Sequence, residues 1–355
     1  MVFYPELLRF ESGRPVASAK DWPARRVEIL NILAKEEYGF LPPVYAPGTG
    51  KVVNSAEKCC SGHAVLESVE ITVQTDRGPF TFPMHAFVPT RVKETPCPLF
   101  LLVNFRPDIY DMYYPTEEIV DNGFILAVLN YSDVTSDDGN MQDGLCGLFD
   151  RPEDGTGFGK ITLWAWAASR ALDYWFTRPE VDKAHTAVIG HSRLGKTALW
   201  CGANDERFRY VFSNDSGCAG AAYEREKHEG AEKIDDIAAR FPYWFCENYQ
   251  RYVGKPQALP FDQHELLALI APRYLSVHSA SRDQWADPVS EQLSCTAASP
   301  VWELLGETGF MGNDAPFVPE QNEDGGHIAY YLRDGIHFLG RGDWLRAMEF
   351  IKKHW

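Results

Sequence analysis

The sequence predicts an α/β fold in which a mainly parallel central sheet is flanked by helices, within one domain spanning residues 1–355. Two continuous apolar runs, at residues 98–104 and 124–130, are typical of strands that helices bury on both faces. Strand patterns then alternate with helix patterns, which is the order expected of parallel strands joined by crossover helices. The sequence shows no internal repeat and no linker, so we expect a single domain.

A helix is expected near the N-terminus, at residues 20–39. Asp21 would cap it, Pro23 suits its first turn and Gly39 ends it. Its apolar face would consist of Val27, Leu30, Ile32 and Leu33. We therefore expect residues 1–60 to form an N-terminal helical cover.

The next segments predict a hairpin, two buried strands and a long loop. Residues 65–73 and 80–88 alternate apolar with polar side chains around the turn Asp76-Arg77-Gly78. A short crossover helix fits residues 116–122, between the two apolar runs. Residues 133–160 are rich in Gly and Asp without periodicity, which indicates a surface loop, and loops of this length are often functional.

The C-terminal half continues the alternation. A helix is expected at 161–176, followed by a strand that ends at Gly190. Further strands are expected at 210–215, 273–279 and 328–332, and a final helix at 344–353. Residues 216–262 are expected to form a mostly helical insertion after the strand that follows Gly190.

A candidate nucleophile lies at a predicted strand-to-helix corner. The apolar strand ends at Gly190, a helix follows Gly195, and Ser192 stands between them. This arrangement is typical of the nucleophile elbow of α/β-hydrolases, in which a strained turn lifts a serine hydroxyl clear of the sheet. Residues 190–197 also fit G-x-x-x-x-G-K-T, the phosphate-binding P-loop, and these residues alone leave both interpretations open.

An elbow serine needs an acid and a histidine, which arrive in that order after later strands. Asp215 follows the strand after the elbow, and Asp283 follows the strand at 273–279. His337 lies in a glycine-flanked segment between the last strand and the final helix. The sequence therefore supplies Ser192, two candidate acids and His337 in the order that an α/β-hydrolase requires.

Composition restricts the partners. A net charge of −16 repels phosphodiester backbones, so we expect no nucleic-acid partner. No run approaches ~18 apolar residues and no secretory signal is visible, which predicts no membrane span and favours the cytoplasm unless a signal was removed. The eight cysteines lack zinc-like spacing, and His264-Glu265 lacks the second histidine of a zinc-protease helix. We expect no metal or other cofactor, and nothing indicates an oligomeric state.

The chain resembles the glucuronoyl esterases of carbohydrate esterase family 15, especially bacterial members that are often labelled acetylxylan esterase-like. The similarity extends over nearly the whole sequence and rests on these segments: D-W-P-A-R-R-V-E-I-L from Asp21, W-A-W-A-A-S-R-A-L-D-Y from Trp164, G-H-S-R-L-G-K-T-A-L-W from Gly190, S-N-D-S-G-C-A-G-A-A from Ser213, L-P-F-D-Q-H-E-L-L-A-L-I-A-P-R from Leu259, D-Q-W-A-D-P from Asp283 and G-I-H-F-L-G-R-G-D-W from Gly335. This resemblance implies an α/β-hydrolase fold and decides against the P-loop.

The resemblance also implies roles. Ser192 would be the nucleophile and His337 the general base, while Arg193 would assist the oxyanion. Sugar contacts would come from Lys196, Trp285 and, by a looser match, Glu232. The family's acid commonly follows the serine by 23 residues, which favours Asp215, although Glu is usual there and some members use the later loop that holds Asp283. His191 and Phe338 occupy the positions of two cysteines that form a disulfide in fungal members.

The expected function is a serine esterase that cleaves esters of 4-O-methyl-glucuronic acid in glucuronoxylan-derived or lignin-carbohydrate substrates. Backbone N–H groups of Arg193 and of residues 104–106 would hold the oxyanion. One alternative is an acetyl or small-acyl carbohydrate esterase. Another is a uronate-sugar-binding protein with weak catalysis, suggested by the change from Glu to Asp at position 215.

Overall fold

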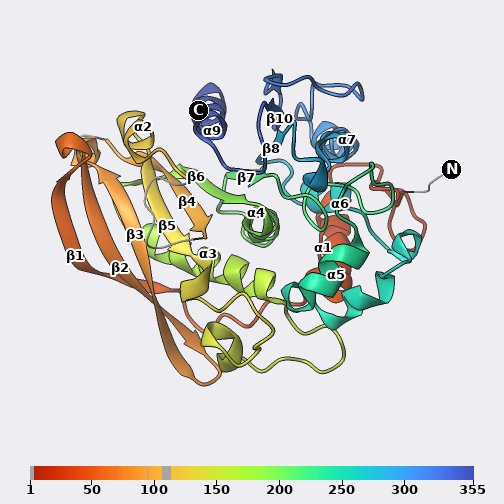
Figure 1. Cartoon of the computed structure of the whole chain (residues 1–355), viewed down its shortest axis with the longest axis horizontal. Helices are drawn as coiled ribbons and strands as arrows, with labels where there is room; N and C mark the ends of the chain where they lie inside the picture. The colour runs from red at the N-terminus through yellow and green to blue at the C-terminus, as the bar shows by residue number, and fades with distance from the viewer. Residues whose placement is uncertain (1–3, 94, 106–112) are drawn as a thin grey trace.

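A computed structural model describes residues 4–93, 95–105 and 113–355, and within them ten strands form one twisted sheet (Figure 1). The strands are β1 (Thr49–Cys59), β2 (Ala64–Thr75), β3 (Gly78–Pro89), β4 (Cys97–Asn104), β5 (Ile125–Asn130), β6 (Val181–His191), β7 (Tyr210–Asn214), β8 (Tyr274–Ala280), β9 (Asn322–Glu323) and β10 (Ile328–Arg333). The α-helices are α1 (Trp22–Leu33), α2 (Thr116–Asp121), α3 (Lys160–Trp175), α4 (Arg193–Asn204), α5 (Ile234–Arg240), α6 (Gln263–Ala268), α7 (Pro288–Ala298), α8 (Pro300–Leu304) and α9 (Arg341–Lys353).

The strand order across the sheet is β1-β2-β3-β5-β4-β6-β7-β8-β10-β9. The strands from β5 to β10 in that order run parallel to their neighbours, whereas β1, β2 and β3 add an antiparallel edge and β9 pairs antiparallel with β10. This confirms the mainly parallel α/β sheet and the hairpin predicted around residues 76–78.

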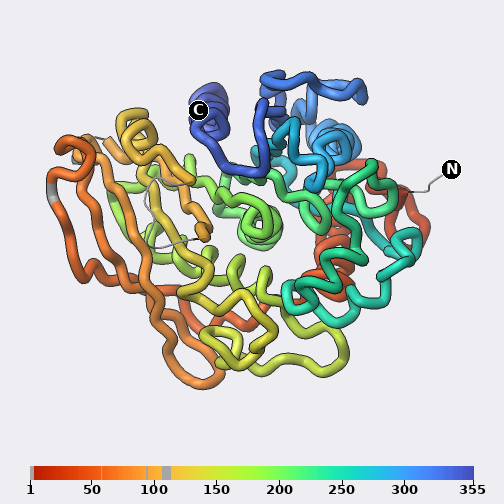
Figure 2. Tube along the Cα trace, in the orientation of Figure 1, coloured from red at the N-terminus to blue at the C-terminus, as the bar shows by residue number. Residues whose placement is uncertain are grey.

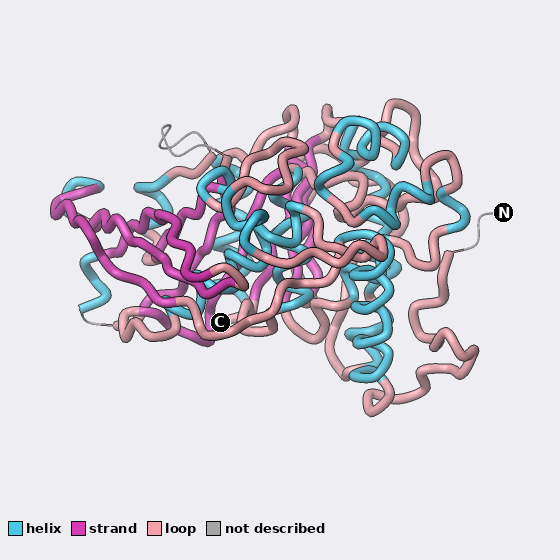
Figure 3. Tube along the Cα trace, turned by 90° about the horizontal axis from the view of Figure 1, so that it is seen from below, coloured by secondary structure: helices cyan, strands magenta, loops and turns pink. Residues whose placement is uncertain are grey.

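Helices cover both faces of the central strands, which explains why β4 and β5 are apolar throughout. Alternate β4 side chains point to opposite sides: Leu101 belongs to the core under α1, α3 and α4, and Leu102 to the core under α2 and α9. The two cores therefore share one sheet. Loops and short helices gather at the end of the molecule that carries the N-terminus (Figure 3).

The N-terminal cover differs from the prediction in three respects. Asp21 does not cap α1, because its carboxylate instead binds Arg14 and the N–H groups of Ala17 and Ser18. Val27 is 53% exposed and contributes nothing to the buried face. Residues 49–59, expected within the helical cover, form β1, because they extend the predicted hairpin by pairing along β2.

The insertion at residues 216–262 is less helical than expected. It contains α5 and three short 3₁₀ segments, Pro242–Trp244, Glu247–Tyr252 and Pro256–Ala258, which are joined by turns and loops. The segment follows an irregular path beside α1 in the trace (Figure 2). Residues 133–160 form the predicted long loop. In the described part of the chain, no helix is long and apolar enough to cross a membrane.

The parallel strands bring distant parts of the chain to one edge. Ser192 follows β6, Asp215 follows β7, Asp283 lies three residues after β8, and His337 lies four residues after β10. Because the carboxyl ends of parallel strands meet at the same edge of the sheet, all four side chains approach one another there.

Candidate active site

Ser192 occupies a strained turn between β6 and α4. Its backbone has φ +56° and ψ −127°, a conformation that residues other than glycine rarely adopt. Its N–H donates to the Asn214 carbonyl over 2.8 Å, which fixes the turn against β7. The turn is so tight that a Cβ on Gly190 would lie 2.0 Å from the Leu194 carbonyl oxygen. The corner thus has the backbone geometry of a nucleophile elbow.

The same corner does not form the phosphate-binding loop that its sequence also permitted. α4 begins at Arg193, so the residues that would form a phosphate-cradling loop are already helical. The Lys196 side chain is 4% exposed, and its Nζ donates to the Ser216 carbonyl. This lysine is therefore held inside the protein rather than directed to an open loop.

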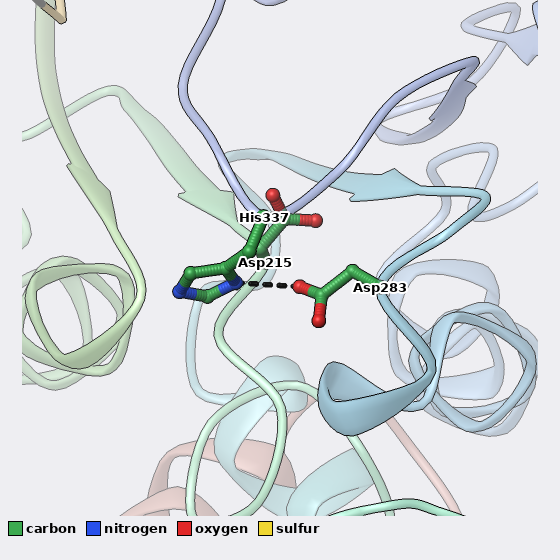
Figure 4. Close-up of side chains that lie close together, drawn as sticks. All are labelled: Asp215, Asp283 and His337. Atoms are coloured by element: carbon green, nitrogen blue, oxygen red, sulfur yellow. Dashed lines mark hydrogen bonds and ion pairs between the residues drawn. The ribbon is translucent and has the colours of Figure 1, made fainter.

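His337 forms a short hydrogen bond to Asp283, with 2.5 Å between Nδ1 and Oδ2 (Figure 4). An ionised carboxylate only accepts hydrogen bonds, so the pairing places the proton on Nδ1 and leaves Nε2 as the basic nitrogen. The Asp283 side chain is 5% exposed and also accepts from the Ala286 N–H. Asp283 is thus fixed in the conformation that orients the imidazole.

The loop that carries His337 is fastened by Arg333. Its Nη2 donates to the carbonyl oxygens of Ile336 and Phe338, on either side of the histidine, over 2.9 and 2.6 Å. Its Nε donates to Asp343, a buried residue in the first turn of α9. The backbone of His337 is therefore set by an arginine at the end of β10.

Asp215, which the family spacing favoured as the acid, makes a different contact. Its Oδ2 accepts from the Phe338 N–H over 3.2 Å, while Oδ1 is buried and has no hydrogen-bond partner among the residues that the structure describes. Burial, together with the nearby carboxylates of Asp283, Glu291 and Asp343, raises the pKa of Asp215 well above its usual range. The expectation that Asp215 is the acid stays a prediction, but the hydrogen bonds do not favour it, because Asp215 contacts the backbone of the His337 loop and Asp283 bonds the imidazole.

These residues surround a cavity of about 190 Å³ at the edge of the sheet. The cavity is lined by Ser192, Arg193, Lys196, Asp215, Ser216, Gly217, Glu232, Arg240, Phe241, Trp244, Trp285, Ala286 and His337. Ser192 and His337 thus face the same space. Seven of the eight side chains expected at the site line it, and the eighth, Asp283, is hydrogen-bonded to His337.

The cavity brings the expected sugar-contacting residues together. Lys196 Nζ lies 4.0 Å from a carboxylate oxygen of Glu232, whose backbone N–H donates to the Trp285 carbonyl over 2.9 Å. Trp285 is 38% exposed, and the guanidinium of Arg240 lies 4.9 Å from its ring centre. The lining of the cavity therefore combines an aromatic ring with cationic and carboxylate groups.

Arg193 is held in a cage that the sequence did not reveal. Its guanidinium forms an ion pair with Asp137 and lies over the rings of Phe105, Phe241 and Trp244. Burial lowers the pKa of Arg193 from its ordinary value. Two signals could have indicated these partners: the acidic loop at residues 133–160 and the aromatic run F-P-Y-W-F at residues 241–245.

His191 lies beside His337, and the expected oxyanion segment comprises residues 104–106. The His191 ring lies 4.4 Å from the His337 ring, and burial with the neighbouring His337 lowers the pKa of His191 to about 3, so it stays neutral. Of the expected oxyanion loop at 104–106, Arg106 lies outside the described residues, and the Asn104 side chain donates to Asn130.

The carboxylates of Asp215 and Asp283 and the imidazole of His337 place ligand atoms within 4.8 Å of one another. Such a set could coordinate a metal ion. Its hydrogen bonds also suit an imidazole oriented by a carboxylate, which is what an elbow serine requires of its base.

Comparisons with known proteins agree on one family. The model of the family described as "Glucuronyl esterase, fungi" matches residues 71–306. Carbohydrate esterase MZ0003 from an unknown prokaryotic organism is 31% identical over 397 aligned residues, covering 99% of this chain and 89% of that protein. The 4-O-methyl-glucuronoyl methylesterase 1 of Wolfiporia cocos is 27% identical over 346 residues, covering 94% of this chain and 78% of that protein.

Solved structures give the same relationship. The glucuronoyl esterase from Solibacter usitatus superposes with a TM-score of 0.91 at 33% identity, covering 100% of this chain and 98% of that one. A promiscuous family 15 esterase from a marine bacterial metagenome also gives a TM-score of 0.91, at 29% identity, with coverage of 100% and 98%. The arrangement of strands and helices is therefore shared over the full chain.

Proposed function

The chain belongs to the glucuronoyl esterase family of carboxylic ester hydrolases, with an α/β-hydrolase fold, and from this premise we propose that it is a serine esterase acting on esters of 4-O-methyl-glucuronic acid. The substrate class follows from relatives named 4-O-methyl-glucuronoyl methylesterases. The observation that carries the mechanism is the strained Ser192 facing the same cavity as the oriented His337.

In the proposed first step, the Ser192 Oγ attacks the carbonyl carbon of the uronate ester while His337 Nε2 takes the hydroxyl proton of Ser192. The resulting tetrahedral intermediate expels the alcohol, which receives the proton from His337, and an acyl-enzyme remains on Ser192. Water then attacks the acyl group with His337 again acting as base. The products are the free uronic acid, which ionises, and the regenerated serine.

The proposed acid is Asp283, because it bonds His337 Nδ1 and can stabilise the imidazolium that forms in each step. Asp215 is assigned a supporting role through the Phe338 N–H. This assignment keeps the expected catalytic residues and gives the role of acid to Asp283, the second of the two candidates, rather than to Asp215.

The oxyanion would form beside the N-terminus of α4. The first N–H groups of a helix have no partner within the helix, and the helix dipole favours negative charge there. Arg193 supplies both such an N–H and a cationic side chain at the cavity. Donors fixed before reaction stabilise developing charge more than donors that must reorganise.

The sugar would occupy the space between the catalytic pair and the mouth of the cavity. Lys196 and Glu232 line the cavity and would bond ring hydroxyls, and the 38% exposed Trp285 would offer an aromatic face to the sugar. Arg240, which stacks on Trp285, adds a third cation to a cavity within an acidic protein. Together these groups favour a sugar whose ester becomes a carboxylate.

The test is Ser192→Ala, assayed on the methyl or benzyl ester of glucuronic acid beside the unchanged protein. Loss of the nucleophile should reduce kcat by ~10⁴-fold or more. The unchanged protein is also assayed on p-nitrophenyl acetate and acetylated xylan. Faster turnover of acetyl esters than of uronate esters would favour a small-acyl esterase, and binding of glucuronoxylan fragments without turnover would favour a sugar-binding protein.

A further inference from the structure

Asp137 stands in the long loop between β5 and α3 and reaches the arginine that follows the candidate nucleophile. One of its carboxylate oxygens forms an ion pair with Arg193 Nη1. The side chains are 12% exposed at Asp137 and 24% at Arg193, so solvent screens the pair only weakly. A partly buried guanidinium needs such a counter-charge to offset its desolvation.

Three aromatic rings enclose the same guanidinium. Its Cζ lies 5.4 Å from the ring centre of Phe105, 5.6 Å from that of Phe241 and 4.8 Å from that of Trp244. Cation–π contacts attract the arginine but leave it free to slide and rotate across the rings. The ion pair with Asp137 fixes the direction in which its N–H groups point.

Asp137 is itself held on several sides. Its second carboxylate oxygen accepts from Trp244 Nε1 over 2.6 Å, and its carbonyl accepts from the Tyr243 hydroxyl over 3.0 Å. Beneath it, the fully buried Lys160 donates to the carbonyl of Ser136 over 2.7 Å. The Asp137 carboxylate therefore links Arg193 to Trp244, and its backbone belongs to a loop that Lys160 holds in place at Ser136.

We propose that Asp137 is a positioning residue, which holds the Arg193 guanidinium where it can stabilise the oxyanion formed on the ester carbonyl. The inference rests on the proposed esterase function. A donor acts in the transition state only if its place is set before the reaction, and a displacement of 1 Å can cost ~10²-fold in rate. Without Asp137, the arginine would sample several rotamers within its cage.

The experiment is a double-mutant cycle on the methyl ester of glucuronic acid. Asp137→Ala and Asp137→Asn are measured in the unchanged protein and together with Arg193→Ala. We expect each Asp137 variant to lower kcat by ~10- to 100-fold while KM changes less than ~3-fold. In the Arg193→Ala background, where no guanidinium remains to be placed, the same changes should cost less than ~2-fold.

The matched control is Asp138→Asn. Asp138 is the next residue in the same loop and lies 3.3 Å from Lys160, away from the arginine cage. This variant should retain kcat within ~2-fold, and Asp137→Glu should recover part of the loss because it restores the negative charge. Near-ultraviolet circular dichroism of each variant checks that the aromatic packing around residues 241–245 is retained.

An equal loss of kcat in the unchanged protein and in the Arg193→Ala background would show that Asp137 acts through the loop rather than through Arg193. Unchanged kcat in Asp137→Ala would also overturn the inference. Absence of turnover in the unchanged protein would contradict the proposed function instead. The two failures are therefore distinguished by whether the unchanged protein turns over the ester: only when it does can the double-mutant cycle reject the positioning role.

Discussion

At the scale of single residues, the site depends on which of two carboxylates meets an imidazole. Asp215 and Asp283 both follow neighbouring parallel strands, and both lie within 4.8 Å of His337. Asp283 bonds the ring, whereas Asp215 bonds the backbone of the next residue, Phe338. Two carboxylates that lie close to one imidazole therefore make different hydrogen bonds, one to the ring and one to the backbone beside it.

Asp283→Asn should lower kcat on the glucuronate methyl ester by ~10⁴-fold. The amide that replaces the carboxylate can donate to Nδ1, which would then place the proton on Nε2 and remove the base that Ser192 needs. Turnover numbers with saturating ester measure the effect.

Asp215→Asn is the matched control for that substitution. Its amide oxygen can still accept from the Phe338 N–H, so kcat should fall by less than ~10-fold. A larger loss in Asp215→Asn than in Asp283→Asn would return the role of acid to Asp215.

At the scale of elements, the corner between β6 and α4 requires glycine at one position. A Cβ on Gly190 would collide with the Leu194 carbonyl oxygen, which is backbone and cannot move aside. Gly190→Ala should therefore lower the free energy of unfolding by at least ~2 kcal/mol, as measured by urea titration.

Gly139→Ala is the control for the corner. Among the described residues, the nearest atom to a Cβ there would be on the Tyr243 ring, at 4.0 Å, so stability should change by less than ~0.5 kcal/mol. Similar losses of stability at both glycines would mean that the collision with the Leu194 carbonyl is not what makes alanine unfavourable at position 190.

Glu291 joins α7 to the loop after β7 and to β8. Its carboxylate accepts from the Gly217 N–H, from the Ser216 hydroxyl and from the Ser279 hydroxyl. Burial raises its pKa from the ordinary 4.5 to about 7, although these three donors oppose the rise. The folded protein thus keeps this proton over a pH range in which the unfolded chain releases it.

A pH-dependent stability follows from Glu291. Proton binding favours the folded state fully below pH 4.5, and this contribution is lost as pH rises through about 7. Because one pKa unit corresponds to about 1.4 kcal/mol, the free energy of unfolding should fall by on the order of 3 kcal/mol over this range. In Glu291→Gln, which stays neutral, unfolding titrations from pH 5 to 8 should lack this decline.

Glu303→Gln, at an exposed position on α8, provides the comparison for Glu291. Its stability should follow that of the unchanged protein at every pH. A Glu291→Gln variant whose stability falls as steeply as that of the unchanged protein would contradict the assignment.

At the scale of the whole molecule, one sheet connects nearly every part of the chain. It runs without a break from β1 to β9, and the larger core includes residues from Leu7 to Leu332. The second core lies on the opposite face of the same strands. This continuity supports the proposal of a single domain for residues 1–355, with the insertion at 216–262 folded against it.

The whole chain should accordingly unfold as one cooperative unit. Tryptophan fluorescence and far-ultraviolet circular dichroism, followed through the same urea titration, should give coincident transitions. Two separated transitions would mean that the N-terminal cover or the insertion unfolds independently of the sheet.

The sequence alone determined those features that depend on local pattern. Continuous apolar runs identified β4 and β5, because strand burial leaves its signal in neighbouring residues. The glycines around Ser192 fitted both a nucleophile elbow and a P-loop, and the family resemblance decided between them. β1 was missed, since most of its side chains are exposed and its pairing depends on the distant register of β2. His337 was found by its position after the last strand.

Tertiary structure decided which acid serves that histidine and what holds Arg193. Asp283 bonds His337 because Arg333 and Asp215 fix the histidine loop in one orientation, and this depends on packing among four chain segments. Asp137 meets Arg193 from a loop with no periodicity. Hydrogen bonds between such segments are set by distances of tenths of an ångström, whereas sequence spacing fixes only which residues reach the same edge of the sheet.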